Sequence, residues 1–176
     1  IRWIVDNLFV GNKLARGEVK AAPGSYVDLK AIRSPIVMFS SKGDNITPPQ
    51  QAINWVSDVY SSTAEIKARG QVIVGLVHES VGHLGIFVSG KVAQKEHTEI
   101  IEALDYIEML RPGLYLMEIE ETPGTGKDRY LSTFTEVTLE ERRKFNWVQR
   151  KDEKPFAVVA EVSTMNEKAY TLFARP

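Results

Sequence analysis

The chain of 176 residues has no cysteine, no strong excess of one charge and no long hydrophobic run. Without cysteine, these residues cannot supply a disulfide, a thiolate metal site or a cysteine nucleophile. The 22 basic and 23 acidic residues give a formal net charge of -1, so the composition provides no general attraction to nucleic acid or to an anionic membrane. No apolar run approaches the ~18 residues of a membrane span, and no signal-peptide pattern is present. These absences predict a cytoplasmic protein without a membrane span.

The rest of the composition is typical of a folded globular protein, since 43% of the residues are hydrophobic and 26% are charged. Apolar residues recur at helical spacing from Ile4 to Phe9, which predicts an amphipathic helix over about residues 2–14. Because this helix starts at once, and because Ile1 is not a methionine, we expect the chain to be part of a longer protein. The missing amino-terminal part of that protein is then an expected partner.

Two dense apolar runs predict neighbouring strands of a parallel sheet. Residues 36–39 and residues 72–77 are apolar without alternation, as in strands that are buried on both faces. Each run ends in a glycine-bearing loop. A helix that starts at Thr47-Pro48-Pro49 follows the first strand, and a helix with Ala93, Ile100, Leu104 and Ile107 on one face follows the second. This order predicts a right-handed βαβα unit. Two strands are too few for a stable sheet, which again indicates missing strands.

The pattern changes after residue 113. Residues 114–120 alternate in polarity and residues 130–137 are rich in aromatic and β-branched side chains, so they predict an antiparallel hairpin around the turn at 122–126. A short charged helix over 139–146 and a longer helix over 155–173 should follow.

The predicted fold class is therefore α/β. Residues 1–113 would form the carboxyl-terminal part of a parallel α/β core, and residues 114–176 would form a hairpin and a helical tail packed on it. The tail carries surplus apolar residues, namely Trp147, Phe156, Tyr170 and Phe173. These residues either pack the last helix onto the body or form a surface for a partner, a second copy of the chain or a hydrophobic polymer, and the sequence does not separate these alternatives.

The strongest candidate site residues are Asp44 and His83. Each follows the carboxyl end of a predicted parallel strand, which is where open α/β sheets build their sites, and the spacing of 39 residues fits one helix and one strand. Gly43 and Gly82 stand beside them, as tight turns require. In a nucleophilic triad, an acid orients a histidine that takes the proton of the nucleophile. The alternative is that Asp44 caps a turn or helix and that His83 is an ordinary loop residue.

Several segments resemble the carboxyl-terminal part of polyhydroxyalkanoate synthases. They are Trp3–Leu14, Asp28–Pro35, Gly43–Pro48 and Ser80–Gly85, within roughly residues 1–90. The whole chain is more similar still to the DUF3141 family, a group often labelled 3-hydroxyalkanoate synthetase. The resemblance implies an α/β-hydrolase fold and acyl-thioester chemistry, with Asp44 as the acid and His83 as the histidine. Asn45 and Pro49 depart from the synthases, which usually have histidine and tryptophan there.

The nucleophile of such a triad is absent from these residues. No G-x-S-x-G or G-x-C-x-G motif occurs, and neither Ser80 nor Ser89 lies in a strand–turn–helix context. The leading hypothesis is an acyltransferase or hydrolase for a hydroxyacyl thioester or ester, with the nucleophile upstream, so this part alone should be inactive. The alternative is a non-catalytic scaffold or granule-associated protein that retains the fold.

We predict neither a metal nor a cofactor. His78 and His83 are five residues apart, and on a helix this spacing would point the two imidazoles in different directions. The segment Gly124–Lys127 lacks the first glycine and the final hydroxyl residue of a phosphate-binding loop.

Overall fold

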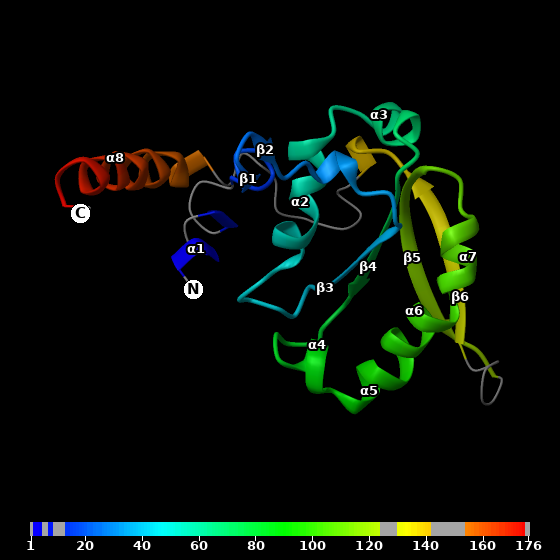
Figure 1. The fold of residues 1–176 in the computed structure, drawn as a ribbon. Coiled ribbons are helices and arrows are strands. Elements are labelled where there is room, and N and C mark those ends of the chain that lie inside the picture. The colour runs from blue at the N-terminus through cyan, green and yellow to red at the C-terminus, as the bar shows by residue number, and fades with distance from the viewer. Residues whose placement is uncertain (1, 5–6, 9–12, 124–129, 142–153, 175–176) are drawn as a thin grey trace. The chain divides into compact units, whose positions relative to one another are not determined.

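Figure 1 shows the computed structural model, which describes residues 2–4, 7–8, 13–123, 130–141 and 154–174. They belong to two compact units. The larger unit is Ile32–Trp147, and the smaller unit combines Ile1–Ala31 with Val148–Pro176. Among the described residues, no helix combines the length and the apolar character needed to cross a membrane.

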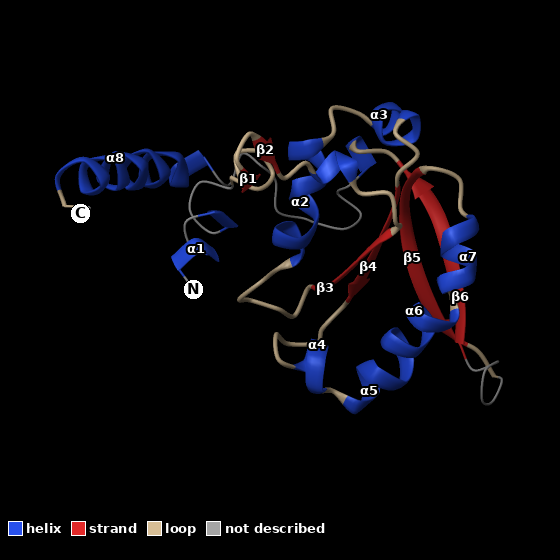
Figure 2. Ribbon diagram, in the orientation of Figure 1, coloured by secondary structure: helices blue, strands red, loops and turns tan. Residues whose placement is uncertain are grey.

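The larger unit is built on a four-stranded mixed sheet with the order β3-β4-β5-β6 (Figure 2). The strands are β3 (Ile36–Ser41), β4 (Val72–His78), β5 (Gly113–Glu121) and β6 (Tyr130–Val137). The first three are parallel, and β6 is antiparallel to β5. The sheet confirms an α/β architecture.

The two apolar runs form β3 and β4, as the sequence predicts. Residues 72–76 of β4 are all buried, as in a strand whose two faces are both covered. The hairpin of β5 and β6 is also present, but β5 has a second role that the sequence analysis missed, since it is also the third parallel strand. The hairpin and the parallel strands are therefore parts of one sheet. The predicted domain boundary after residue 113 stays a prediction.

The helices of the larger unit are α2 (Pro49–Val59), α3 (Thr63–Ala68), α4 (Gly85–Val88), α5 (Gly90–Val92), α6 (Thr98–Glu102) and α7 (Leu104–Met109). The helix predicted after the first strand is confirmed as α2. The predicted helix after β4 is broken into α5, a π-helical turn over Ala93–His97, α6 and α7. The Thr98 hydroxyl donates to the Ala93 carbonyl at 2.9 Å within the π-helical turn. Ile107 is buried as expected, whereas Leu104 is exposed.

The helix α3 was not predicted, although the sequence contains a signal for it. Ser62 caps the helix by accepting from the Glu65 backbone N–H at 3.2 Å, and the Glu65 carboxylate accepts from the Ser61 N–H at 2.9 Å. This reciprocal arrangement is a variant of the capping box, which a serine followed three residues later by glutamate predicts.

One cluster of the core of the larger unit lies between α7 and the sheet. Its buried members are Val72, Val74, Leu76, Ile107, Tyr115 and Met117. This packing fixes β4 and β5, and thereby the strand end from which the His83 loop departs.

The smaller unit contains α1 (Arg2–Ile4), the hairpin of β1 (Lys20–Ala22) and β2 (Ser25–Tyr26), a 3₁₀ turn (Leu29–Ala31) and α8 (Ala157–Phe173). The last helix is confirmed, and none of its side chains is buried against the described residues. The predicted helix over 2–14 is described only in part. The predicted turn at 122–126 and the helix at 139–146 lie largely outside the described residues.

Candidate active site

The site begins at the aligned ends of two parallel strands. Ser41, the last residue of β3, stands beside His78, the last residue of β4. The loops that follow them therefore start at the same edge of the sheet, and they carry Asp44 and His83. This alignment is why two residues so far apart in sequence can meet.

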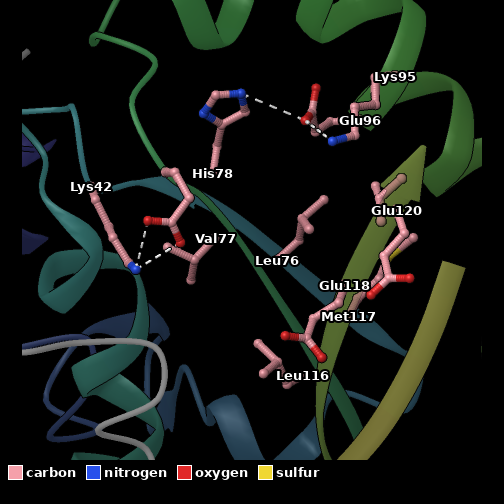
Figure 3. A pocket seen from close by; sticks show the side chains of 12 residues that line it. Lys42, Leu76, Val77, His78, Lys95, Glu96, Leu116, Met117, Glu118 and Glu120 are labelled. Carbon is pink, nitrogen blue, oxygen red and sulfur yellow. Dashed lines mark hydrogen bonds and ion pairs between the residues drawn. The ribbon is translucent and has the colours of Figure 1, made fainter. Parts of the chain in front are cut away.

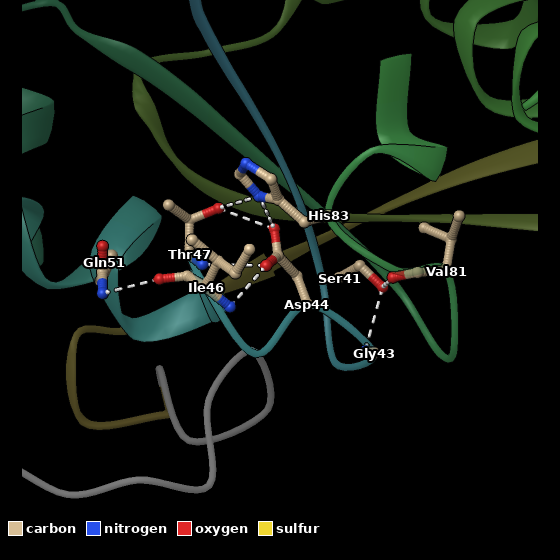
Figure 4. A network of polar contacts seen from close by, with 8 residues as sticks. All are labelled: Ser41, Gly43, Asp44, Ile46, Thr47, Gln51, Val81 and His83. Atoms are coloured by element: carbon tan, nitrogen blue, oxygen red, sulfur yellow. Dashed lines mark hydrogen bonds and ion pairs between the residues drawn. The ribbon is translucent and has the colours of Figure 1, made fainter. Parts of the chain in front are cut away.

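Asp44 is fully buried and uses its two carboxylate oxygens differently. Its Oδ1 accepts from the backbone N–H groups of Ile46 at 2.9 Å and Thr47 at 2.8 Å, just before α2. Its Oδ2 lies 2.9 Å from Nδ1 of His83 (Figure 4). The two roles that the sequence left open for Asp44, a turn cap and a partner of histidine, are thus filled by different atoms of one side chain.

The His83 ring is partly exposed, with 30% of its side-chain surface accessible. Because a carboxylate can only accept, the short Oδ2–Nδ1 distance assigns the hydrogen to Nδ1. Nε2 then carries the lone pair, and in Figure 4 this nitrogen points away from Asp44 and Thr47. The arrangement can accept a proton at Nε2 while the acid remains buried.

Asp44 is ionised at neutral pH. Burial raises the pKa of its carboxyl, but the hydrogen bonds from Thr47, His83 and the Ile46 N–H outweigh burial and hold this pKa well below its usual range. A permanent negative charge beside Nδ1 is what stabilises an imidazolium once Nε2 has taken a proton.

A second set of contacts ties the two loops together. The Ser41 hydroxyl donates to the Val81 carbonyl at 2.6 Å and accepts from the Gly43 N–H at 3.1 Å. Within the β4 loop, Nδ1 of His78 accepts from the N–H groups of Ser80 and Val81, both at 3.1 Å. These contacts fix the backbone just before the acid and just before the histidine.

Gly43 is required by this close approach. A Cβ at this position would overlap with the Ser80 carbonyl and lie 2.8 Å from the Val81 oxygen. Gly82, the other glycine noted in the sequence, has open space around it and no left-handed backbone, so nothing in its surroundings demands glycine.

We therefore expect Gly43→Ala to lower the free energy of unfolding of the complete protein by about 1–3 kcal/mol, because backbone must shift to admit the methyl group. Gly82→Ala is the matched control and should be close to neutral. Urea denaturation of both variants checks this difference. Equal stabilities of the two variants would contradict the packing described here.

Ser80 and Ser89 do not act as partners of His83 in the structure. Ser80 is exposed and bonds to His78 through its backbone, and the Ser89 hydroxyl accepts from the Val92 N–H at 3.4 Å at the start of α5.

A cavity of about 380 Å³ lies at the ends of β4 and β5 (Figure 3). Its lining includes His78, whose Nε2 lies 3.6 Å from the buried Glu96 carboxylate, but no lining residue carries a hydroxyl.

No group of three or more histidine, aspartate or glutamate side chains among the described residues is placed to hold a metal ion. The parts that Thr47, Ser41 and His78 play in this site were not predicted from the sequence. Only Thr47 had a signal, since it follows Asp44 by three residues, as in a side-chain cap.

A family model described as "Protein of unknown function (DUF3141)" matches residues 1–176. The chain belongs to the DUF3141 family. This confirms the resemblance drawn from the sequence.

Two curated relatives of this DUF3141 chain extend the comparison. An uncharacterized protein in the ackA 5′ region of Rhizobium meliloti is 45% identical over 182 residues, which cover 100% of the chain and 25% of that protein. The poly(3-hydroxyalkanoate) polymerase subunit PhaC of Haloferax mediterranei is 28% identical over 128 residues, which cover 71% of the chain and 26% of that protein. The chain thus spans about a quarter of each relative, and the second match supports a relation to polyhydroxyalkanoate synthases. No solved structure matches the DUF3141 chain significantly.

Proposed function

We propose that the chain is the carboxyl-terminal part of an α/β-hydrolase-type acyltransferase or hydrolase. In this proposal, His83 is the general base and Asp44 is the acid that orients it. The observation that carries the proposal is the contact of 2.9 Å between the buried Asp44 Oδ2 and His83 Nδ1, at the aligned ends of β3 and β4. The similarity to a poly(3-hydroxyalkanoate) polymerase subunit supports acyl transfer as the reaction class.

The reaction needs a serine or cysteine from another part of the complete protein. Nε2 of His83 takes the nucleophile's proton as its oxygen or sulfur attacks the carbonyl carbon of a hydroxyacyl thioester. The tetrahedral intermediate collapses to an acyl-enzyme, and the thiol leaves with the proton from Nε2. A hydroxyl of a second acyl group, or water, then gives its proton to Nε2 and attacks the carbonyl carbon of the acyl-enzyme. The bond between the acyl group and the nucleophile breaks, and the nucleophile takes the proton back from Nε2. Asp44 remains ionised throughout.

The proposal predicts one activated nucleophile in the complete protein. Incubation with serine-directed and cysteine-directed probes should produce a single covalent adduct in the intact mass spectrum. The same protein unfolded in urea before labelling is the control, and it should lose this selectivity. If the folded protein forms no adduct with either probe, the proposal is wrong.

One observation favours a second candidate, a non-catalytic scaffold or granule-associated protein. Apolar side chains of α8 are exposed, among them Val158, Met165, Leu172 and Phe173. Such a helix can associate with a partner, a second copy or a hydrophobic polymer. A folded complete protein that binds polymer granules but lacks any reactive nucleophile would establish this candidate.

A further inference from the structure

Thr47 closes a triangle of polar atoms with Asp44 and His83. Its Oγ1 lies 2.7 Å from Asp44 Oδ2 and 3.0 Å from His83 Nδ1, and the third side of the triangle is the 2.9 Å contact between Oδ2 and Nδ1. Figure 4 shows the threonine hydroxyl directed toward both partners. Thr47 also donates its backbone N–H to the other oxygen of the same carboxylate.

The hydrogens of this triangle can be assigned. The ionised carboxylate only accepts, so the Thr47 hydroxyl donates to Oδ2, and a lone pair on its oxygen remains for Nδ1. If Nδ1 lacked a hydrogen, its lone pair would face Oδ2 at 2.9 Å, and the single threonine hydrogen would have to serve both atoms. All three contacts are satisfied only when Nδ1 carries a hydrogen.

We infer that Thr47 is a positioning residue that fixes the plane of the Asp44 carboxylate and supports the hydrogen bond from His83 Nδ1 to Oδ2. It supplies two of the contacts to that carboxylate, one to each oxygen, and an acceptor for the histidine. The imidazole thereby keeps an orientation in which the lone pair of Nε2 is available to a nucleophile. The benefit to turnover rests on the proposed function, whereas the effect on the Asp44–His83 hydrogen bond does not.

Two variants separate the hydroxyl from the shape of the side chain. Thr47→Val retains the volume and the backbone N–H but removes the hydroxyl, and Thr47→Ser retains the hydroxyl. In the complete protein, we expect Thr47→Val to lower kcat about tenfold with little change in KM, since a hydrogen bond to a charged group is lost at a partly exposed site. Thr47→Ser should keep kcat within about twofold.

The hydrogen bond between Nδ1 and Oδ2 is measured independently of turnover by ¹H and ¹⁵N NMR of the complete protein labelled at histidine, with His83 signals assigned by their absence in His83→Gln. We expect the Nδ1 hydrogen to exchange with solvent several-fold faster in Thr47→Val, because the carboxylate is held less firmly, and at the wild-type rate in Thr47→Ser. Faster exchange in Thr47→Val without any turnover in the wild type would uphold the positioning role while refuting the proposed function. An unchanged exchange rate in Thr47→Val overturns the inference, as does an equal loss of kcat in both variants.

Discussion

Replacing His83 with alanine in the complete protein is expected to lower kcat/KM for a hydroxyacyl thioester by roughly 10³-fold or more. The substitution removes the Nε2 lone pair that takes the nucleophile's proton, and it leaves the charge of the buried Asp44 without its imidazole partner. Labelling by the nucleophile-directed probe should slow to a similar degree. Turnover of the thioester and the rate of adduct formation are the two measurements.

His97→Ala is the matched control for this substitution. The His97 ring packs edge-on against Phe39, with centroids 5.8 Å apart, and it has no contact with Asp44. Its loss should leave turnover nearly unchanged. If the folded His83→Ala protein retains more than a tenth of the wild-type activity, His83 is not the general base.

Asp44→Asn is expected to reduce turnover by about 10⁴-fold, the second large effect. The N–H groups of Ile46 and Thr47 will keep the amide oxygen at the position of Oδ1, since only an acceptor fits there. The amide nitrogen must then face His83 Nδ1. A donor at this position favours the Nε2–H tautomer, in which Nε2 has no lone pair for the nucleophile. Steady-state kinetics of the folded variant check the expected loss, and a loss under tenfold would contradict it.

The same variant should change how stability depends on pH. The pKa of the Asp44 carboxyl is depressed in the folded protein, so its charged form contributes stability that is fully present above the unfolded pKa of about 4. This contribution is lost as the pH falls below that value toward the folded pKa. The advantage of the wild type over Asp44→Asn in urea denaturation should therefore shrink as the pH falls below ~4. An advantage that does not change with acid would contradict the depressed pKa.

Much of the fold could be predicted because short sequence patterns, such as apolar runs and helix-start residues, indicate where its strands and helices lie. The apolar runs of β3 and β4 and the proline start of α2 contain their own signals. The double role of β5 has no such signal, because pairing with β4 depends on residues about forty positions away. The break of the predicted helix after β4 could not be predicted either, because apolar residues continue at helical spacing through the π-helical turn.

The candidate site, like the fold, could be predicted from the sequence only in part. Asp44 and His83 follow strand ends, a position that the sequence reveals once the strands are recognised. The link from the Ser41 hydroxyl to the Val81 carbonyl and the two bonds of His78 Nδ1 depend on backbone geometry that no spacing encodes.

The two prolines that start α2 also affect the acid and its partners. Pro48 follows Thr47 directly, and the ring of a proline confines the preceding residue to extended backbone. The backbone of Thr47 thus has fewer conformations available even before Asp44 folds into place. The unfolded segment has fewer conformations to lose, so the cost in entropy of assembling the buried carboxylate is reduced in advance.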